Sequence, residues 1–234
     1  MIDVIIADDD VHIVEQLSCM LTKEKDIRVV RTCSNGLDTI MSYNSLRPTT
    51  LILDLDLPGV DGLSVLENLE NSVNDVIIYS DSDFHYSQIG DAKKVRWVIK
   101  KTSKPETLIP IIRKIKSEKD ANIYKNLPTE IDKAFKNLHF KQNYKGVSYL
   151  KSAILISYPN TNISLKGILD KLEEEYACNP STIQSIMQKY LRKSYNEQKD
   201  KNIYYEMFPE YCGDEPSPKT FISCMINYLN RIYN

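Results

Sequence analysis

The first half of the chain alternates short apolar runs with amphipathic segments. Five runs rich in β-branched residues predict buried strands at 2–7, 27–33, 50–55, 75–79 and 95–99. Apolar positions at helical spacing predict helices at 11–23, 36–46, 63–69, 84–91 and 105–116. Strands and helices that alternate in this way form one parallel sheet covered on both faces. We therefore predict an α/β doubly wound domain over residues 1–118.

The pattern changes in the second half, where helical spacing replaces the apolar runs. A charged and polar stretch at 119–127 predicts a linker. Residues 128–234 then predict an all-α domain, with helices at 128–140, 145–158, 165–176, 183–195 and 217–232. A short turn with Asn179 and Pro180, which favour a helix start, separates the third and fourth of these helices. This pair predicts a helix-turn-helix.

Composition and charge support two domains with different tasks. The chain has 234 residues, more than the roughly 100–200 typical of one domain. Residues 1–118 hold 14 Lys and Arg against 19 Asp and Glu, whereas residues 119–234 hold 16 against 13. An acidic half joined to a mildly basic half suggests two functions, one of which could involve nucleic acid.

The sequence also predicts where the protein is found. No apolar run approaches the ~18 residues of a membrane span, and the N-terminus lacks the basic and apolar regions of a secretory signal. The five cysteines are scattered, without a Cys-x-x-Cys pair, which disfavours a zinc site or a disulfide framework. We expect a cytoplasmic protein with no membrane partner.

Side chains that can carry chemistry stand at the ends of the predicted strands. In a parallel sheet of this kind the active crevice lies beyond the carboxyl ends of the strands. Asp8 and Asp9 follow the first predicted strand, and Asp54 closes the third. Ser80 follows the fourth strand and Lys100 follows the fifth. We therefore expect carboxylates, a hydroxyl and an amine to meet at one edge of the sheet.

This set of side chains predicts phosphoryl transfer. Clustered carboxylates raise each other's pKa unless a cation joins them, and Mg²⁺ prefers such oxygen ligands. An aspartate can accept phosphate as the nucleophile, while a metal ion, an amine and a hydroxyl meet the phosphoryl oxygens. The alternative is that strand-end aspartates cap helices and form turns, and it stays open for Asp10 and Asp61.

Four segments of the first half resemble the receiver domain of two-component response regulators. The segments are Ile-Ile-Ala-Asp-Asp-Asp (5–10), Leu-Asp-Leu-Asp-Leu-Pro-Gly-Val-Asp-Gly-Leu (53–63), Tyr-Ser (79–80) and Trp-Val-Ile-Lys (97–100). The resemblance covers about residues 1–118 and implies a flavodoxin-like fold with five parallel strands. It also implies phosphorylation by a sensor histidine kinase or a phosphotransferase.

The resemblance implies a role for each residue at a strand end. Asp54 would be the phosphoacceptor, while Ser80 and Lys100 would hold the phosphoryl group. Trp97 would be the aromatic switch residue, with a plain edge-strand aromatic as the alternative. The implied ligands of Mg²⁺ are Asp8, Asp9, Asp54 and the backbone carbonyl of Asp56.

Two positions depart from the receiver pattern. Asp81 replaces the small residue usual after Ser80, and Lys101 replaces the proline usual after Lys100. A carboxylate beside an incoming phosphoryl group is electrostatically unfavourable, and the customary cis-proline turn is lost. These departures predict phosphorylation that is slow or has an unusual donor, with regulation by other means as the alternative.

The second half resembles the DNA-binding effector domain of the sporulation initiation master regulator family. The resemblance lies in Lys-Gly-Val-Ser-Tyr-Leu-Lys-Ser-Ala-Ile (145–154), Ser-Thr-Ile (181–183) and residues 218–229. It implies a six-helix domain whose recognition helix enters the major groove, and a homodimer when the receiver is phosphorylated. The expected DNA-binding residues are Ser181, Thr182, Gln184, Ser185, Gln188, Lys189, Arg192 and Lys193.

The expected base preference differs from that of the family. Ser185 and Gln188 stand where the family has arginines, so bidentate contacts to guanine, each worth about 1–3 kcal/mol, would be missing. Gln184 and Gln188 suit adenine better.

Three functions are compatible with these observations. The first is a transcription regulator whose binding to promoter DNA depends on phosphate at Asp54. The second is an adaptor whose helical half binds another protein instead of DNA. The third, an aspartyl-phosphate type phosphatase, is disfavoured because the sequence shows no substrate-pocket residues, and we predict that the protein is not an enzyme.

Overall fold

The computed structural model describes residues 1–70, 75–81, 93–141, 143–197, 202–211 and 215–233. The chain divides into two compact units, which we call unit 1 (Met1–Ala121) and unit 2 (Asn122–Asn234). No helix within the described ranges is both long enough and apolar enough to cross a membrane.

Unit 1 is built on a five-stranded parallel sheet. The strands are β1 (Ile2–Ala7), β2 (Ile27–Cys33), β3 (Thr50–Leu53), β4 (Val76–Tyr79) and β5 (Val95–Ile99). They lie in the order β2-β1-β3-β4-β5, and all four pairings are parallel. β3 and β4 are buried along their whole length, which explains their uninterrupted apolar sequences.

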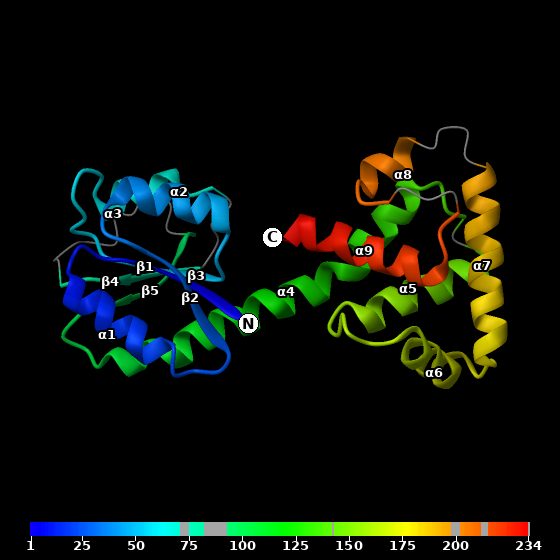
Figure 1. The fold of residues 1–234 in the computed structure, drawn as a ribbon, viewed down its shortest axis with the longest axis horizontal. Helices are drawn as coiled ribbons and strands as arrows, with labels where there is room; N and C mark the ends of the chain where they lie inside the picture. The colour runs from blue at the N-terminus through cyan, green and yellow to red at the C-terminus, as the bar shows by residue number, and fades with distance from the viewer. Residues whose placement is uncertain (71–74, 82–92, 142, 198–201, 212–214, 234) are drawn as a thin grey trace. The chain divides into compact units, whose positions relative to one another are not determined.

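Helices cover both faces of this sheet. They are α1 (Val11–Leu21), α2 (Gly36–Leu46), α3 (Gly62–Asn68) and α4 (Leu108–Asn137), with a short 3₁₀ turn at Pro105–Thr107 before α4. α2 and α3 pack on one face, and α1 packs with the first turns of α4 on the other (Figure 1). The predicted helix at 84–91 lies outside the described residues. The doubly wound α/β fold predicted for the first half is confirmed.

Residues 119–127, predicted as a linker, are helical and lie inside α4. This 30-residue helix joins two predicted helices, and the boundary between the units falls within it. A charged and polar stretch suits a solvent-exposed helix as well as a linker, so composition alone could not distinguish the two. Pro128 sits within α4, where it cannot donate a hydrogen bond to the preceding turn.

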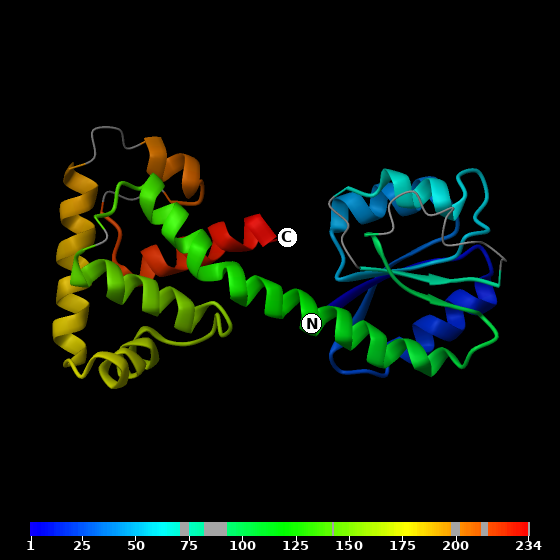
Figure 2. The same ribbon diagram turned by 180° about the vertical axis from the view of Figure 1, so that it is seen from behind.

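Unit 2 is helical in every regular element of its described residues. After the last turns of α4 come α5 (Lys145–Ser157), α6 (Leu165–Tyr176), α7 (Pro180–Glu197), α8 (Asn202–Met207) and α9 (Pro218–Tyr233). α5 packs against α6, α7 and α9 (Figure 1, Figure 2). Aromatic rings fill the core, where Phe221 contacts the rings of Phe135, Phe140 and Phe208.

Candidate functional site

Two buried aspartates stand side by side at the carboxyl edge of the sheet. β1 and β3 pair in a register that sets Ala7 opposite Leu53. Asp8 and Asp54 directly follow these residues, and the amide of Asp54 donates to the carbonyl of Ala7 at 2.8 Å. The two aspartates are 2% and 3% exposed. The register therefore brings both carboxylates to the same level in a place largely closed to water.

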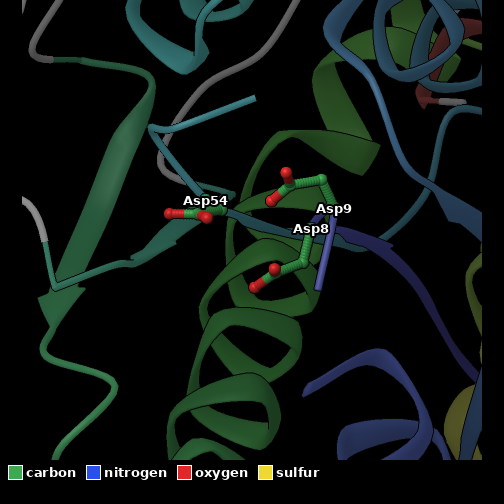
Figure 3. A group of neighbouring side chains, drawn as sticks. All are labelled: Asp8, Asp9 and Asp54. Atoms are coloured by element: carbon green, nitrogen blue, oxygen red, sulfur yellow. The ribbon is translucent and has the colours of Figure 1, made fainter. Parts of the chain in front are cut away.

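A third carboxylate completes the cluster. Asp9, the exposed neighbour of Asp8, joins Asp8 and Asp54 so that one oxygen from each lies within 4.8 Å of the others (Figure 3). Three hard oxygen donors this close together repel one another and favour a bound cation. The structure thus brings together the three carboxylates that the strand ends predict.

The loop after Asp54 holds this residue closely. One oxygen of its carboxylate, Oδ1, accepts the amide hydrogen of Leu55 at 2.7 Å. The amide of Gly62, where α3 begins, donates to the carbonyl of Leu55 at 2.9 Å. A Cβ at position 62 would collide with the carbonyl oxygen of Asp54, so only glycine allows this approach.

Lys101 places its ammonium between two of the carboxylates. Its Nζ lies 2.7 Å from Oδ2 of Asp8 and 2.8 Å from Oδ2 of Asp54. The hydroxyl of Tyr79, at the end of β4, donates to the backbone carbonyl of Lys101 at 3.4 Å. Lys101 therefore supplies a positive charge within the acidic cluster.

Burial and pairing shift the pKa values at this site. Burial alone lowers the pKa of the Lys101 amine, but the hydrogen bonds to Asp54 and Asp8 outweigh burial and raise the pKa above its ordinary value. Burial raises the pKa of Asp8, and the hydrogen bond from Lys101 opposes that rise only in part. The protonated amine and the carboxylates stabilise one another.

The predicted lysine, Lys100, lies elsewhere. Its side chain is exposed, and its Nζ donates to the backbone carbonyl of Asp81 at 3.1 Å. The sequence pattern does not identify Lys101, because β5 ends at Ile99 and the alternation of a strand no longer decides which of two successive lysines faces the cluster. The sequence signal for Lys101 was that two successive lysines follow this strand, and either of them could face the acidic cluster.

Two further predicted side chains, the hydroxyl of Ser80 and the carboxylate of Asp81, directly follow β4. Ser80 is buried at the end of β4, and its amide donates to the carbonyl of Ile99 at 3.2 Å. Asp81 is exposed, and its Oδ1 accepts the amide of Thr102 at 3.3 Å. The carboxylate of Asp81 is thus engaged with the loop after β5. The side chain of Asp56 is exposed.

Two other acidic residues cap helices. Oδ1 of Asp10 accepts the amide of His12 at 2.8 Å, at the start of α1. Oδ1 of Asp61 accepts the amide of Ser64 at 2.9 Å, at the start of α3. The capping interpretation is confirmed for both residues.

Trp97, the predicted switch residue, is half-buried on β5. It packs beside the core under α1 and α4. The guanidinium of Arg96 lies 4.5 Å from the centre of its ring, and Nζ of Lys114 lies 5.1 Å away. These cation–π contacts hold the ring between β5 and α4.

The second candidate site is the turn between α6 and α7. Ala177 has a left-handed backbone (φ +48°), and Oδ1 of Asn179 caps α7 by accepting the amide of Ser181 at 2.9 Å. Of the residues predicted to face DNA, Gln188 is half-buried. The others are exposed, namely Ser181, Thr182, Gln184, Ser185, Lys189, Arg192 and Lys193.

Two cations of α7 have protein partners. Nε of Arg192 lies 2.9 Å from Oε2 of Glu215. Nζ of Lys193 lies 3.8 Å from Oε1 of Glu197 and 5.4 Å from the ring centre of Tyr144. Exposed pairs of this kind are weak in water.

Comparison with known proteins assigns the first part of the chain. Residues 4–113 match the family model of the response regulator receiver domain. The transcriptional regulatory protein BtsR of Escherichia coli K12 is 34% identical over 79 residues, which are 34% of this chain and 33% of BtsR. A protein-glutamate methylesterase/protein-glutamine glutaminase of Methanospirillum hungatei is 37% identical over 67 residues, 29% of this chain and 20% of that protein.

The chain is also similar to a solved structure. The receiver domain of AraT, a response regulator from Geobacillus stearothermophilus, aligns with a TM-score of 0.44 at 26% identity. The alignment covers 51% of this chain and 96% of that domain. The chain matches about a third or less of the length of its curated relatives.

Proposed function

Residues 4–113 form a response regulator receiver domain, and from this premise we propose that the chain is a phosphorylation-dependent transcriptional response regulator. One observation carries the proposal. Asp8, Asp9 and Asp54 converge at the carboxyl edge of the sheet, and the ammonium of Lys101 bridges two of them. A nucleophilic carboxylate next to further anionic ligands and a fixed cation is the equipment that phosphoryl transfer to aspartate requires.

The donor set fits Mg²⁺. Carboxylate oxygens are the ligands this ion prefers, and Asp9 is exposed, so the cluster is open to solvent on one side. Asp8, Asp9 and Asp54 would hold the ion, together with the backbone carbonyl of Asp56. When bound, Mg²⁺ supplies positive charge that offsets the charge of the phosphoryl oxygens.

In the proposed reaction an oxygen of Asp54 attacks the phosphorus of a phosphohistidine. The new O–P bond forms as the N–P bond breaks, and the imidazole leaves with a proton from solvent. Before transfer the ammonium of Lys101 contacts Oδ2 of Asp54, and after transfer it contacts the phosphoryl oxygens. Ser80, at the end of β4, donates its hydroxyl hydrogen to the same group. The phosphate donor is a sensor histidine kinase or a phosphotransferase.

The output is DNA binding by unit 2 as a homodimer. α7 would lie in the major groove, with Ser181, Thr182, Gln184 and Ser185 near its N-terminal end at the base edges. Lys189, Arg192 and Lys193 would meet phosphates, and half-buried Gln188 would contribute less to base reading than its sequence position suggests. The likeness to a protein named a transcriptional regulator supports this output.

The test is binding of the full chain to a promoter fragment at several salt concentrations. We expect acetyl phosphate with Mg²⁺ to strengthen binding by the wild type and to leave binding by Asp54→Asn unchanged.

Lys193→Ala should weaken binding to all sequences alike and reduce the salt slope by about one, whereas Gln184→Ala should alter base preference. Equal loss from both substitutions would contradict these roles, and no binding at low salt would favour a protein-binding adaptor.

A further inference from the structure

A buried carboxylate at the opposite edge of the sheet connects the layers of unit 1. Asp75 directly precedes β4 and is 2% exposed. Its Oδ2 accepts a 2.6 Å hydrogen bond from the hydroxyl of Tyr43 on α2 and lies 2.9 Å from Nζ of Lys119 on α4. Because α2 and α4 cover opposite faces of the sheet, this one carboxylate binds a helix on each side (Figure 1).

The backbone around Asp75 is fixed by its neighbours in the sheet. Its carbonyl accepts from the hydroxyl of Thr50 at 2.5 Å and from the amide of Leu51 at 3.0 Å. Its own amide donates to the carbonyl of Lys94 at 3.2 Å. These backbone contacts fix the position of Asp75 independently of α4, which favours a strong, oriented contact with Lys119.

Lys119 lies on α4 just before the boundary between the units and contacts Asp75. The core under α4 contains Leu108, Ile112 and Ile115, and Lys119 follows on the same face four residues later. Its neighbour Lys116 pairs with Asp120 on the same helix, so that pair does not hold α4 to the sheet. The side chain of Lys119 is 34% exposed, whereas that of Asp75 is 3% exposed.

We propose that Asp75 and Lys119 form a clamp that fastens the boundary segment of α4, residues 116–121, to the sheet. β4 begins directly after Asp75 and ends directly before Ser80, so the clamp and the phosphoryl site stand at the two ends of one four-residue strand. The clamp itself does not require phosphorylation, and its test is independent of that chemistry.

The test is hydrogen exchange of the backbone amides at 116–121 in the unphosphorylated full chain. Lys119→Met removes the charge that meets Asp75, so exchange there should rise about tenfold. Lys119→Arg keeps the charge and should stay near the wild type. Lys116→Met is the matched control, because it removes one lysine from the same segment without touching the clamp.

A double-mutant cycle separates the clamp from a general loosening of the helix. Asp75→Asn should raise exchange at 116–121 as Lys119→Met does, and the double variant should show less than the sum of the two single effects. Additive effects, or Lys119→Met behaving like Lys116→Met, would overturn the proposal. If Asp75→Asn does not fold, the comparison of the three lysine variants decides alone.

Discussion

The two oxygens of the Asp54 carboxylate have different environments. Oδ1 accepts the amide hydrogen of Leu55, and Oδ2 faces the ammonium of Lys101, which also contacts Asp8. In the proposed transfer, Lys101 exchanges a carboxylate for phosphoryl oxygens, without the loss of a charged partner. This exchange gives Lys101 a role before and after the reaction.

Lys101 and Lys100 provide a matched pair of substitutions. We expect Lys101→Met to slow labelling by acetyl phosphate by about 10²-fold, because a fixed positive charge is lost where negative charge gathers. Lys100→Met should stay near the wild-type rate, since its exposed amine contacts the carbonyl of Asp81 outside the cluster. Initial rates of phosphate incorporation, measured by intact mass, compare the two. A larger loss from Lys100→Met would restore the assignment that the sequence suggests.

Sequence reasoning locates the aspartates of this site but not its lysine. Asp8 and Asp54 directly follow paired buried strands, and parallel strands that are in register bring such residues to one edge. The position of Lys101 depends on a loop after β5, where no periodicity fixes the direction of a side chain. The burial of Gln188 was missed for a related reason, because it lies at the border of the exposed face of α7.

At the scale of elements, α5 and α7 approach each other closely at one glycine. A Cβ at position 146 would lie 2.6 Å from the Cβ of Tyr190, which is closer than real contacts allow. The hydroxyl of Tyr190 also accepts the backbone amide of Lys141 at 2.8 Å. The side chain of Tyr190 therefore cannot move aside without loss of a hydrogen bond.

Gly146→Ala should destabilise unit 2. Overpacking at a rigid helix crossing lowers the free energy of unfolding by about 1–3 kcal/mol. Gly167→Ala is the control, because it also lies in the first turn of a helix, and its Cβ would meet side-chain atoms only, of Ile163 at 3.2 Å and of Ser164 at 3.6 Å. Chemical denaturation of the full chain should leave this control unchanged or stabilised by up to about 1 kcal/mol. Equal effects would show that the α5–α7 contact is not tight.

Elements with a strong apolar period were predicted well, and those without one were not. The strands of unit 1 and α5, α6, α7 and α9 follow their apolar residues closely. The continuity of α4 through 119–127 was missed, because exposed helix and linker share the same polar composition. The short helix α8 was also missed, although Tyr204 and Met207 are buried in the core at helical spacing.

At the scale of the molecule, charge separates the two halves of the sequence. Residues 1–118 have five more acidic than basic residues, and residues 119–234 have three more basic than acidic residues. Phosphate on Asp54 adds up to about two further negative charges to the acidic half. These charges are met inside the site by Lys101, so the proposed response is a change in the conformation of the receiver and in its self-association.

Phosphorylation should therefore change the oligomeric state. We expect the full chain to be a monomer without acetyl phosphate and a homodimer after treatment with acetyl phosphate and Mg²⁺. Sedimentation velocity across a range of protein concentrations measures this change. Asp54→Asn treated in the same way should sediment as the untreated wild type. Dimerisation of this variant upon treatment would show that self-association does not depend on phosphate at Asp54.

The most direct measurement is the covalent state of Asp54 itself. Wild type, Asp54→Asn and Asp10→Asn would be treated with acetyl phosphate and Mg²⁺, and the phosphorylated peptide identified by mass. Asp10→Asn is the matched control, because asparagine also caps a helix and Asp10 lies next to the cluster. We expect one phosphate on the peptide that contains Asp54 in the wild type and in Asp10→Asn, and none in Asp54→Asn. Phosphate that persists in Asp54→Asn, or that is absent from the wild type, would contradict the assignment of Asp54 as the phosphoacceptor.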